Sequence, residues 1–411
     1  MLRLYSYIFV ILTLTTVGQW LSINWWAPNL TVAFMEQCAF FIVLIYPTFK
    51  YKHFPFIRKE PTYTFFNIYV YFTFALSIYA IINYSTIGER SDFAALMVSN
   101  MAMLTCFCVY TFSLPDWFSK TSKKLFKFLP YIAIVYLPFA RDGMYGDLLG
   151  FICAPALLPL LFFADLPKKQ KAVWLLLSIM IVITSFVGDA RSHVIKFSIA
   201  LLIGITYVFD KFYIKLRPAV WAFVIAPFIF LFLGITGTFN IFEMDQYIKD
   251  KSVSAGTITD TRTIVYVEVI SSAINNDYLI WGRGIGRGYE SRFQEGRAAD
   301  NLNATALGAS ERNSEVAIHN IFTWGGIIYV IIYTLMWCSL LHYSVYKSNN
   351  RYVRAVGFYM AFYYFYSWVE NFQGFSIMFI SSWFMVALCL SPYFRKMSDM
   401  EFKGFIGYLF R

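Results

Sequence analysis

Long apolar runs separated by short polar stretches follow one another along almost the whole chain. Their lengths lie near the ~20 residues that an α-helix needs to cross about 30 Å of hydrocarbon, so each run predicts one membrane-spanning helix. The run at 126–140 is the weakest because it is short and contains proline, and without it the orientation of every later run would invert. The predicted spans, about twelve in number, lie at 4–21, 31–47, 64–82, 92–113, 126–140, 148–164, 172–187, 194–209, 219–236, 319–345, 355–370 and 373–391.

One long polar interval, residues 237–318, interrupts this pattern. The chain is thereby divided into nine predicted spans in 1–236, a large loop in 237–318, three spans in 319–391 and a tail in 392–411. Runs of this length indicate helices rather than the ~10-residue alternating strands of an outer-membrane barrel. The predicted fold is therefore an all-α, polytopic bundle of transmembrane helices with one large loop.

Composition supports this interpretation. The chain is 59% hydrophobic and 14% charged, with a mean hydropathy of +0.56, whereas soluble domains are about 45–50% apolar and 25% charged. The first run is not followed by a small-residue cleavage site, which predicts a retained helix rather than a signal peptide. All six cysteines lie in apolar runs, so neither a disulfide framework nor a thiolate metal site is predicted.

The net charge of +10 is distributed unevenly. If the N-terminus lies in the cytoplasm, the loops on that side hold 22 of the 34 Lys and Arg residues, and the short outer loops hold only Arg90 and Arg141. Cytoplasmic loops of membrane proteins are enriched in Lys and Arg. Both termini are therefore predicted inside and 237–318 outside, in the periplasm of a bacterial inner membrane. Because most of the positive charge lies in short loops between apolar runs, nucleic-acid binding is not expected.

Arginines dominate the predicted outer side. Seven of the ten remaining positive residues are arginines, whereas the cytoplasmic loops rely mainly on lysine. A guanidinium recognises phosphate or carboxylate through two parallel N–H bonds. Arg191 precedes a predicted span, and Lys196 lies one turn further into the bilayer. The pair predicts an anion site, and the alternative is a helix-end cluster in which Asp189 neutralises Arg191 and the Lys196 side chain extends outward. Glu36 is a separate candidate to balance Lys196 or another buried cation.

Thr261-Arg262 stands where an amphipathic helix over 262–275 is predicted to begin. A positive charge at the positive end of a helix dipole is unfavourable unless an anion binds there. Four glycines within Gly282–Gly288 predict a tight irregular turn with exposed backbone N–H groups. Arg283 and Arg287 lie in this turn. These arginines are therefore candidate anion ligands, and solvated surface charges are the alternative.

His319-Asn320 opens the tenth predicted span. Glu311, Glu315 and His319 recur at four-residue intervals, which would align them if the helix began early. A histidine at this mouth could accept a proton from a hydroxyl, with Glu315 holding the ring. The alternative is an interfacial histidine without a chemical role.

At these residues the chain resembles the O-antigen polymerase and O-antigen ligase superfamily. The shared features are Arg191 at a helix start, Thr261-Arg262 opening a helix that ends in Asn275-Asn276 before a glycine turn, and His319-Asn320 at the next span. The resemblance covers about 130 residues. Members usually continue to a Gly-Ile-Ile-Gly-like ending, whereas here Gly325-Gly326-Ile327-Ile328 is followed by Tyr329.

The resemblance implies a C-type glycosyltransferase fold and metal-independent, inverting transfer from an undecaprenyl-pyrophosphate-linked glycan, with no cofactor. Arg191 and Arg262 would hold the pyrophosphate and His319 would act as general base. The residues expected to assist in substrate binding are Arg283, Arg287, Lys196, Asn320 and Glu315. Membrane lipid and a chain-length-regulating co-polymerase are the other expected partners.

A polymerase that joins repeat units into O-antigen or capsular polysaccharide is favoured over two alternatives. These are a ligase that transfers glycan to the lipid A core and a flippase that carries lipid-linked glycans. A carrier should place cations along its core from both sides, whereas here they gather at one mouth.

Overall fold

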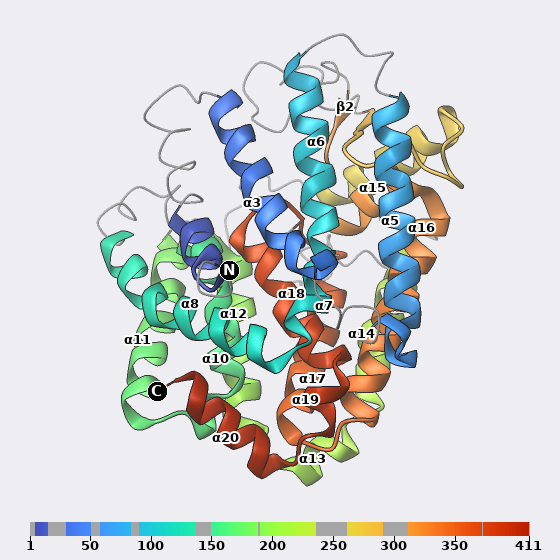
Figure 1. Cartoon of the computed structure of the whole chain (residues 1–411). Coiled ribbons are helices and arrows are strands. Elements are labelled where there is room, and N and C mark those ends of the chain that lie inside the picture. The colour runs from blue at the N-terminus through green and yellow to red at the C-terminus, as the bar shows by residue number, and fades with distance from the viewer. Residues whose placement is uncertain are drawn as a thin grey trace.

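A computed structural model of the chain describes residues 5–14, 30–50, 58–83, 90–136, 149–187, 190–235, 261–290, 311–371 and 373–410 (Figure 1). These residues are almost entirely helical, with one pair of two-residue strands. The helices of the first half are α3 (Leu30–Lys50), α5 (Thr64–Asn83), α6 (Arg90–Leu104), α7 (Cys108–Phe112), α8 (Pro115–Tyr136), α10 (Leu157–Leu161), α11 (Lys168–Val187), α12 (Arg191–Thr206), α13 (Asp210–Lys215) and α14 (Ala219–Ile235). Those of the second half are α15 (Thr261–Asn275), α16 (Ala317–Leu341), α17 (Arg351–Tyr366), α18 (Ile377–Leu390), α19 (Pro392–Lys396) and α20 (Asp399–Leu409).

The structure confirms an all-α membrane protein in outline. Within the described ranges three helices are long and apolar enough to cross a membrane: Pro61–Asn83, Lys168–Phe186 and Ala317–Tyr346. A bent pair, Leu96–Phe112 with Pro115–Tyr136, raises the number to four if it forms one span. The predicted number of about twelve spans stays a prediction.

Apolar side chains cover the outside of the molecule as well as its centre. Leu176 and Phe186 of α11 are 70% and 75% exposed, and Phe232 of α14 is 65% exposed. Every residue of α18, in contrast, is buried, which is the pattern of a helix surrounded by others. Soluble monomers rarely expose apolar surface on this scale, so these outer helices are suited to contact with lipid.

The predicted span at 126–140 needs correction. Residues 115–125, expected in a loop, are the first half of α8, which meets the preceding helical segment at a bend of 117°. The α8 sequence places lysines along one side and apolar residues along the other, so it is a surface helix in its first turns. The apolar run alone could not show this because α8 begins in a polar sequence.

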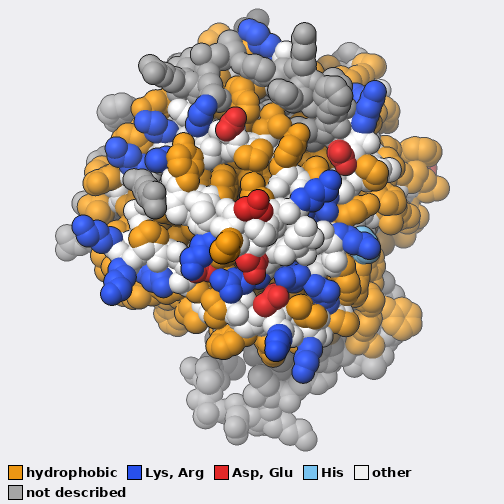
Figure 2. All heavy atoms as spheres, turned by 60° about the horizontal axis from the view of Figure 1, so that its bottom comes forward, with side chains coloured by type: hydrophobic (Ala, Val, Ile, Leu, Met, Phe, Trp, Pro, Cys, Tyr) orange, Lys and Arg blue, Asp and Glu red, His pale blue; other side chains and the backbone are white. Residues whose placement is uncertain are grey.

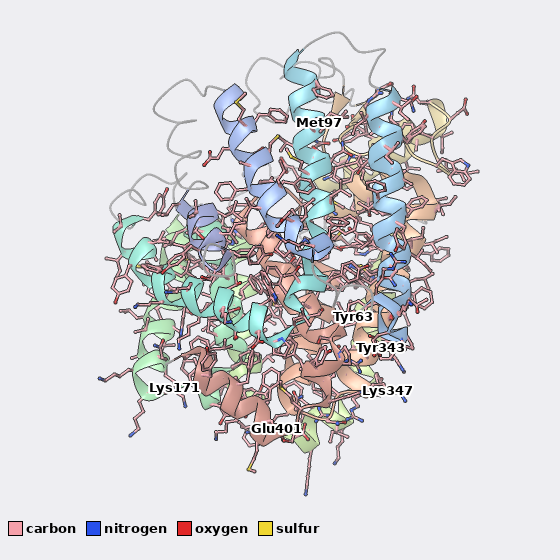
Figure 3. All side chains as sticks on the ribbon, viewed as in Figure 1. Tyr63, Met97, Lys171, Tyr343, Lys347 and Glu401 are labelled. Atoms are coloured by element: carbon pink, nitrogen blue, oxygen red, sulfur yellow. The ribbon has the colours of Figure 1, made fainter. Side chains whose placement is uncertain are left out.

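Several described segments of the predicted cytoplasmic side lie together at one end of the molecule. Figure 1 places α13, α19 and α20 at the bottom, with α15 and β2 near the top. Lys171 and Lys347 project from the lower end in Figure 3, and the same end in Figure 2 is rich in Lys and Arg side chains. The described elements α15 and β2 of the polar interval therefore lie at the end opposite α13, α19 and α20.

The expected tail, residues 392–411, includes two packed helices. Phe394, Phe402 and Ile406 are fully buried, and Ser398 and Glu401 form a capping box at the start of α20. Asp165 anchors this region to the bundle. Its carboxylate accepts hydrogen bonds from three helices, namely from Tyr207 at 2.6 Å, Tyr352 at 2.9 Å, Arg351 at 3.1 Å and Lys403 at 2.9 Å.

We expect the Asp165 cluster to make the stability of the protein depend on pH in the acidic range. Burial opposes ionisation of Asp165, but the hydrogen bonds from Tyr207, Lys403 and Tyr352 outweigh it and lower the pKa to about 2. A lowered native pKa contributes stability above the unfolded value near ~3.9 that is lost as pH falls toward 2. The unfolding temperature of detergent-solubilised protein should therefore fall more steeply between pH 5 and pH 3, as rough limits, in the wild type than in Asp165→Asn.

The control for this prediction is Asp277→Asn, because Asp277 is exposed and its positive φ of 56° is tolerated by asparagine. It should retain the wild-type slope. Equal slopes in Asp165→Asn and the wild type would contradict the prediction.

Candidate active site

The first turn of α16 is held by the segment that follows α17. The first four N–H groups of an α-helix have no partner within it. Here Ala317 N–H donates to Glu370 O at 3.2 Å, and Ile318 N–H donates to Ser367 O at 3.0 Å. The start of α16 is therefore fixed by backbone bonds to a segment about 50 residues later in the chain.

His319 lies in this first turn, is 4% exposed, and is held at one ring nitrogen. Its Nδ1 lies 2.9 Å from Ser314 Oγ. Asn320 fixes Ser314 in turn, because Oδ1 accepts from Ser314 N–H at 2.8 Å and Nδ2 donates to Ser314 O at 3.1 Å. His319 Nε2 has no hydrogen-bond partner among the described residues. One nitrogen is thus oriented, and the other is buried without a hydrogen-bond partner among the described residues.

Tyr266 of α15 fixes the plane of the His319 ring. The two rings pack edge to face, with centroids 3.9 Å apart and an interplanar angle of 82°. The Tyr266 hydroxyl donates to Trp368 O at 2.7 Å. The helix predicted at 262–275 is confirmed as α15, which begins at Thr261. The helical period places Arg262 one turn before Tyr266 on the same face, and the Arg262 side chain lies outside the described residues.

Lys196 joins α12 to the same neighbourhood. Its side chain is 3% exposed, and Nζ lies 3.4 Å from Glu370 Oε2 and 5.7 Å from the Tyr366 ring centroid. Glu370, rather than Glu36, is therefore its counter-charge. Arg191 is exposed at the start of α12, and five residues of helix place it about 7.5 Å beyond Lys196 along the axis.

The glycine turn packs against a break in α16. Gly325 and Gly326 have non-helical backbone angles, which leaves helix hydrogen bonds unmade on either side. Arg283 N–H donates to Thr323 O at 2.8 Å, Gly284 N–H to Trp324 O at 2.9 Å, and Ile327 N–H to Leu279 O at 2.9 Å. Backbone groups inside a membrane need such partners, and the turn supplies them.

This packing corrects the expectation that the turn exposes N–H groups to a ligand. The irregular turn forms, but its amides at 282, 283, 284 and 287 donate to backbone carbonyls. The Arg283 side chain is also engaged, donating to Gly288 O at 3.1 Å and lying 3.6 Å from Glu290. Arg287 is partly buried, and its carbonyl accepts from Trp324 Nε1 at 3.0 Å. Neither arginine contacts His319.

Glu315 also departs from its expected position. The helix begins at Ala317 and Glu311 lies in β2, so the predicted four-residue alignment with His319 does not form. Glu315 is exposed, and Ser314 holds the ring instead. Strand β2 (Glu311–Arg312) pairs with β1 (Tyr289–Glu290), which draws residues 311–316 out of helical geometry.

Three residues of the site were not predicted in these roles: Ser314, Tyr266 and Glu370. Tyr266 could have been found from its helical spacing with Arg262. Ser314 could have been suspected from its place just before a helix, where Ser side chains bind nearby backbone. The Glu370 pairing joins residues 174 positions apart, and no local signal indicates it.

The arrangement is suited to proton transfer in a dry setting. An oriented imidazole presents Nε2 where the starts of α15 and α16 and the segment at 367–371 meet. The cationic start of α12 lies close by, because Lys196 of α12 pairs with Glu370 in this segment. Comparison with family models, curated proteins and solved structures finds no match for this chain.

Proposed function

We propose that this chain is a glycosyltransferase of the bacterial inner membrane that joins undecaprenyl-pyrophosphate-linked repeat units into O-antigen or capsular polysaccharide. The proposal includes about twelve spans, as the hydropathy pattern predicts, in the C-type arrangement that the family resemblance implies, with residues 237–318 on the periplasmic side. The observation that carries it is His319, held at Nδ1 by Ser314 and unpartnered at Nε2 among the described residues.

His319 acts in this proposal as the general base. It does so in the tautomer that carries its proton on Nδ1, which then donates to Ser314 Oγ. The acceptor sugar hydroxyl gives its proton to Nε2 as its oxygen attacks the anomeric carbon of the donor glycan. The bond from that carbon to the pyrophosphate oxygen breaks, and undecaprenyl pyrophosphate leaves with the electron pair. Attack opposite the leaving group inverts the anomeric configuration.

Arg191 and Arg262 stabilise the leaving pyrophosphate. Its negative charge grows in the transition state, and fixed cations placed beforehand stabilise such charge most effectively. Both arginines stand in the first turns of helices, α12 and α15, whose N-terminal N–H groups add to the positive potential. Lys196 is neutralised by Glu370 and positions the start of α12. Asn320 positions Ser314, while Glu315 and Arg287 remain candidates for contacts with the sugars.

The proposal is tested by reconstituting the purified protein in vesicles with lipid-linked repeat units, with and without a chelator. We expect a ladder of glycan lengths that persists without divalent metal. Transfer only when lipid A core is supplied would identify a ligase. Movement of the lipid-linked unit across the bilayer without chain growth would identify a carrier. Loss of the ladder on chelation would overturn the metal-independent mechanism.

In the same assay, Arg262→Ala should lower the rate of chain growth by about 10²–10³-fold, the usual effect of removing one preorganised charge-stabilising group. Arg262→Lys should restore little, because an ammonium cannot make the two-point contact of a guanidinium. Lys211→Ala, an exposed substitution on α13 at the opposite end, is the control. Full activity of Arg262→Ala would remove the arginine from the mechanism.

A further inference from the structure

A cavity that does not include His319 is lined by Ser6 and Tyr7 near the N-terminus and by α8, α11 and α20. These elements lie together at the left of Figure 1, beside the C-terminus. The cavity has a volume of about 1010 Å³. Its wall combines two kinds of side chain, lysines at one end and apolar groups along the rest. The lining includes Tyr7, Lys120, Lys123, Lys124, Lys127, Tyr131, Ile134, Gln170, Leu176, Met180 and Tyr408.

The charge and the apolar surface belong to one continuous stripe of α8. Residues 120, 123, 124 and 127 share a helix face, and the same spacing continues through Tyr131 and Ile134. The stripe therefore changes from cationic to apolar along the helix axis. It extends about 21 Å from Lys120 to Ile134 at 1.5 Å per residue. Tyr131 and Ile134 are 65% and 62% exposed, although they are apolar.

The facing wall has the same polarity. On α11, Gln170 lies at the basic end of the cavity, and Leu176 and Met180 follow along the helix. Met180, at the far end, is about 15 Å from Gln170. Leu176 is 70% exposed. An apolar channel of this length, open along its side, is suited to a hydrocarbon chain that lies between α8 and α11.

None of these lysines is paired with an acid among the described residues. No carboxylate in the part of the chain that the structure describes forms an ion pair with any of the four, and none lines the cavity. Like charges at these spacings on a helix repel one another. Tyrosines instead orient two of them: Lys124 Nζ donates to the Tyr7 hydroxyl at 2.8 Å, and Lys123 lies 4.5 Å from the Tyr408 ring centroid.

We infer that this groove is a binding site for one anionic phospholipid. The headgroup phosphate lies among Lys120, Lys123, Lys124 and Lys127, and an acyl chain lies along Tyr131, Ile134 and Leu176. Charge complementarity favours a headgroup of net negative charge over a zwitterionic one, since juxtamembrane lysines attract anionic lipid. The site lies at the basic end of the molecule, so the lipid comes from the leaflet opposite the proposed active site. The inference does not depend on the proposed function.

Native mass spectrometry of the detergent-purified protein, after incubation with phosphatidylglycerol or phosphatidylcholine in equal amounts, tests the site. We expect the wild type to retain one phosphatidylglycerol and no comparable phosphatidylcholine. A triple variant, Lys120→Gln, Lys123→Gln and Lys127→Gln, should bind phosphatidylglycerol at least about tenfold more weakly, because each lysine near the headgroup contributes to the attraction of anionic lipid. The control triple, Lys211→Gln, Lys215→Gln and Lys396→Gln, removes equal charge from exposed positions outside the groove and should retain the lipid.

Leu176→Trp tests the acyl-chain part of the site independently, because the larger side chain fills the channel from an exposed position and leaves every lysine in place. It should also lose the bound lipid, with an unfolding temperature equal to that of the wild type. Equal retention of both lipids, or equal loss in the two triple variants, would overturn the inference. Displacement of the lipid by inorganic phosphate at low concentration would show a phosphate site without a chain site, and would overturn it as well.

Discussion

Replacing His319 by alanine is expected to lower the rate of glycan chain growth by about 10²–10⁴-fold, the usual contribution of a positioned general base. The reason is geometric. Ser314 and Tyr266 fix the imidazole at Nδ1 and at its face, so Nε2 is the atom presented to an acceptor hydroxyl. The measurement is the initial rate of ladder growth per folded protein in vesicles that contain lipid-linked repeat units.

His319→Asn separates the loss of the base from the loss of packing. An asparagine side chain places a polar atom near the position of Nδ1 and can bind Ser314, but it has no atom at Nε2. It should be as inactive as His319→Ala while unfolding at the wild-type temperature. His342→Ala is the control, since His342 is exposed at the far end of the same helical segment. A wild-type ladder from His319→Asn would leave only the arginines to carry the chemistry.

Ser314→Ala distinguishes a role of Ser314 in orienting His319 from a role in packing alone. Without the Oγ acceptor, His319 loses the group that favours a proton on Nδ1, so a smaller fraction of the protein holds the reactive tautomer. The maximal rate should fall while the concentration of lipid-linked unit needed for half-maximal rate stays constant. Activity at the wild-type level would show that Ser314 only caps the start of α16.

The sequence predicted those parts of the site that are encoded locally. Thr261 begins α15, Arg191 begins α12, and α16 begins two residues before the predicted start at 319. Each of these boundaries follows from a change between polar and apolar sequence within one or two helical turns. The all-α membrane class follows from the same pattern summed over the chain.

What the sequence did not predict depends on contacts between distant segments. Glu370 pairs with Lys196, and the backbone of 279–284 pairs with 323–328. The hydropathy pattern shows 319–345 as a single apolar run. The glycine pair interrupts the helical backbone without making the sequence more polar. The two glycine-containing segments were both visible in the sequence. The pairing of the two segments was not visible in the sequence, since it consists of backbone hydrogen bonds that every residue type except proline can both donate and accept.

This broken helix explains how the polar interval is attached to the bundle. In hydrocarbon, an interrupted helix is stable only where protein or water supplies the missing hydrogen bonds. The turn after α15 donates to and accepts from α16 on both sides of its break, so α15 is held above the first turn of α16. The contact of Tyr266 with His319 therefore depends on a backbone junction about 4 to 9 residues further along α16.

Gly326→Ala is expected to disrupt this junction and with it the folded protein. The backbone of Gly326, with φ of 63° and ψ of −162°, lies in a region that is essentially restricted to glycine and costs other residues about 1–3 kcal/mol. An added Cβ would also lie 2.1 Å from Ile280 O, and overpacking of this kind costs typically about 1–3 kcal/mol. The Ile280 oxygen belongs to the backbone and a Cβ has no rotamer, so no side-chain rotation relieves the contact.

The result should be visible as a much lower yield of monodisperse protein on size exclusion and a lower unfolding temperature, with loss of activity in the surviving fraction. Gly282→Ala should behave alike, because its Cβ would lie 2.3 Å from Gly325 N on the other side of the same contact and its φ is 71°. Gly404→Ala on α20 is the matched control: its Cβ meets nothing within 4 Å, and alanine favours a helix by up to about 1 kcal/mol. If Gly326→Ala unfolded at the wild-type temperature, the glycine turn could not be seated on the break in α16, and the route by which α15 reaches His319 would have to be sought elsewhere.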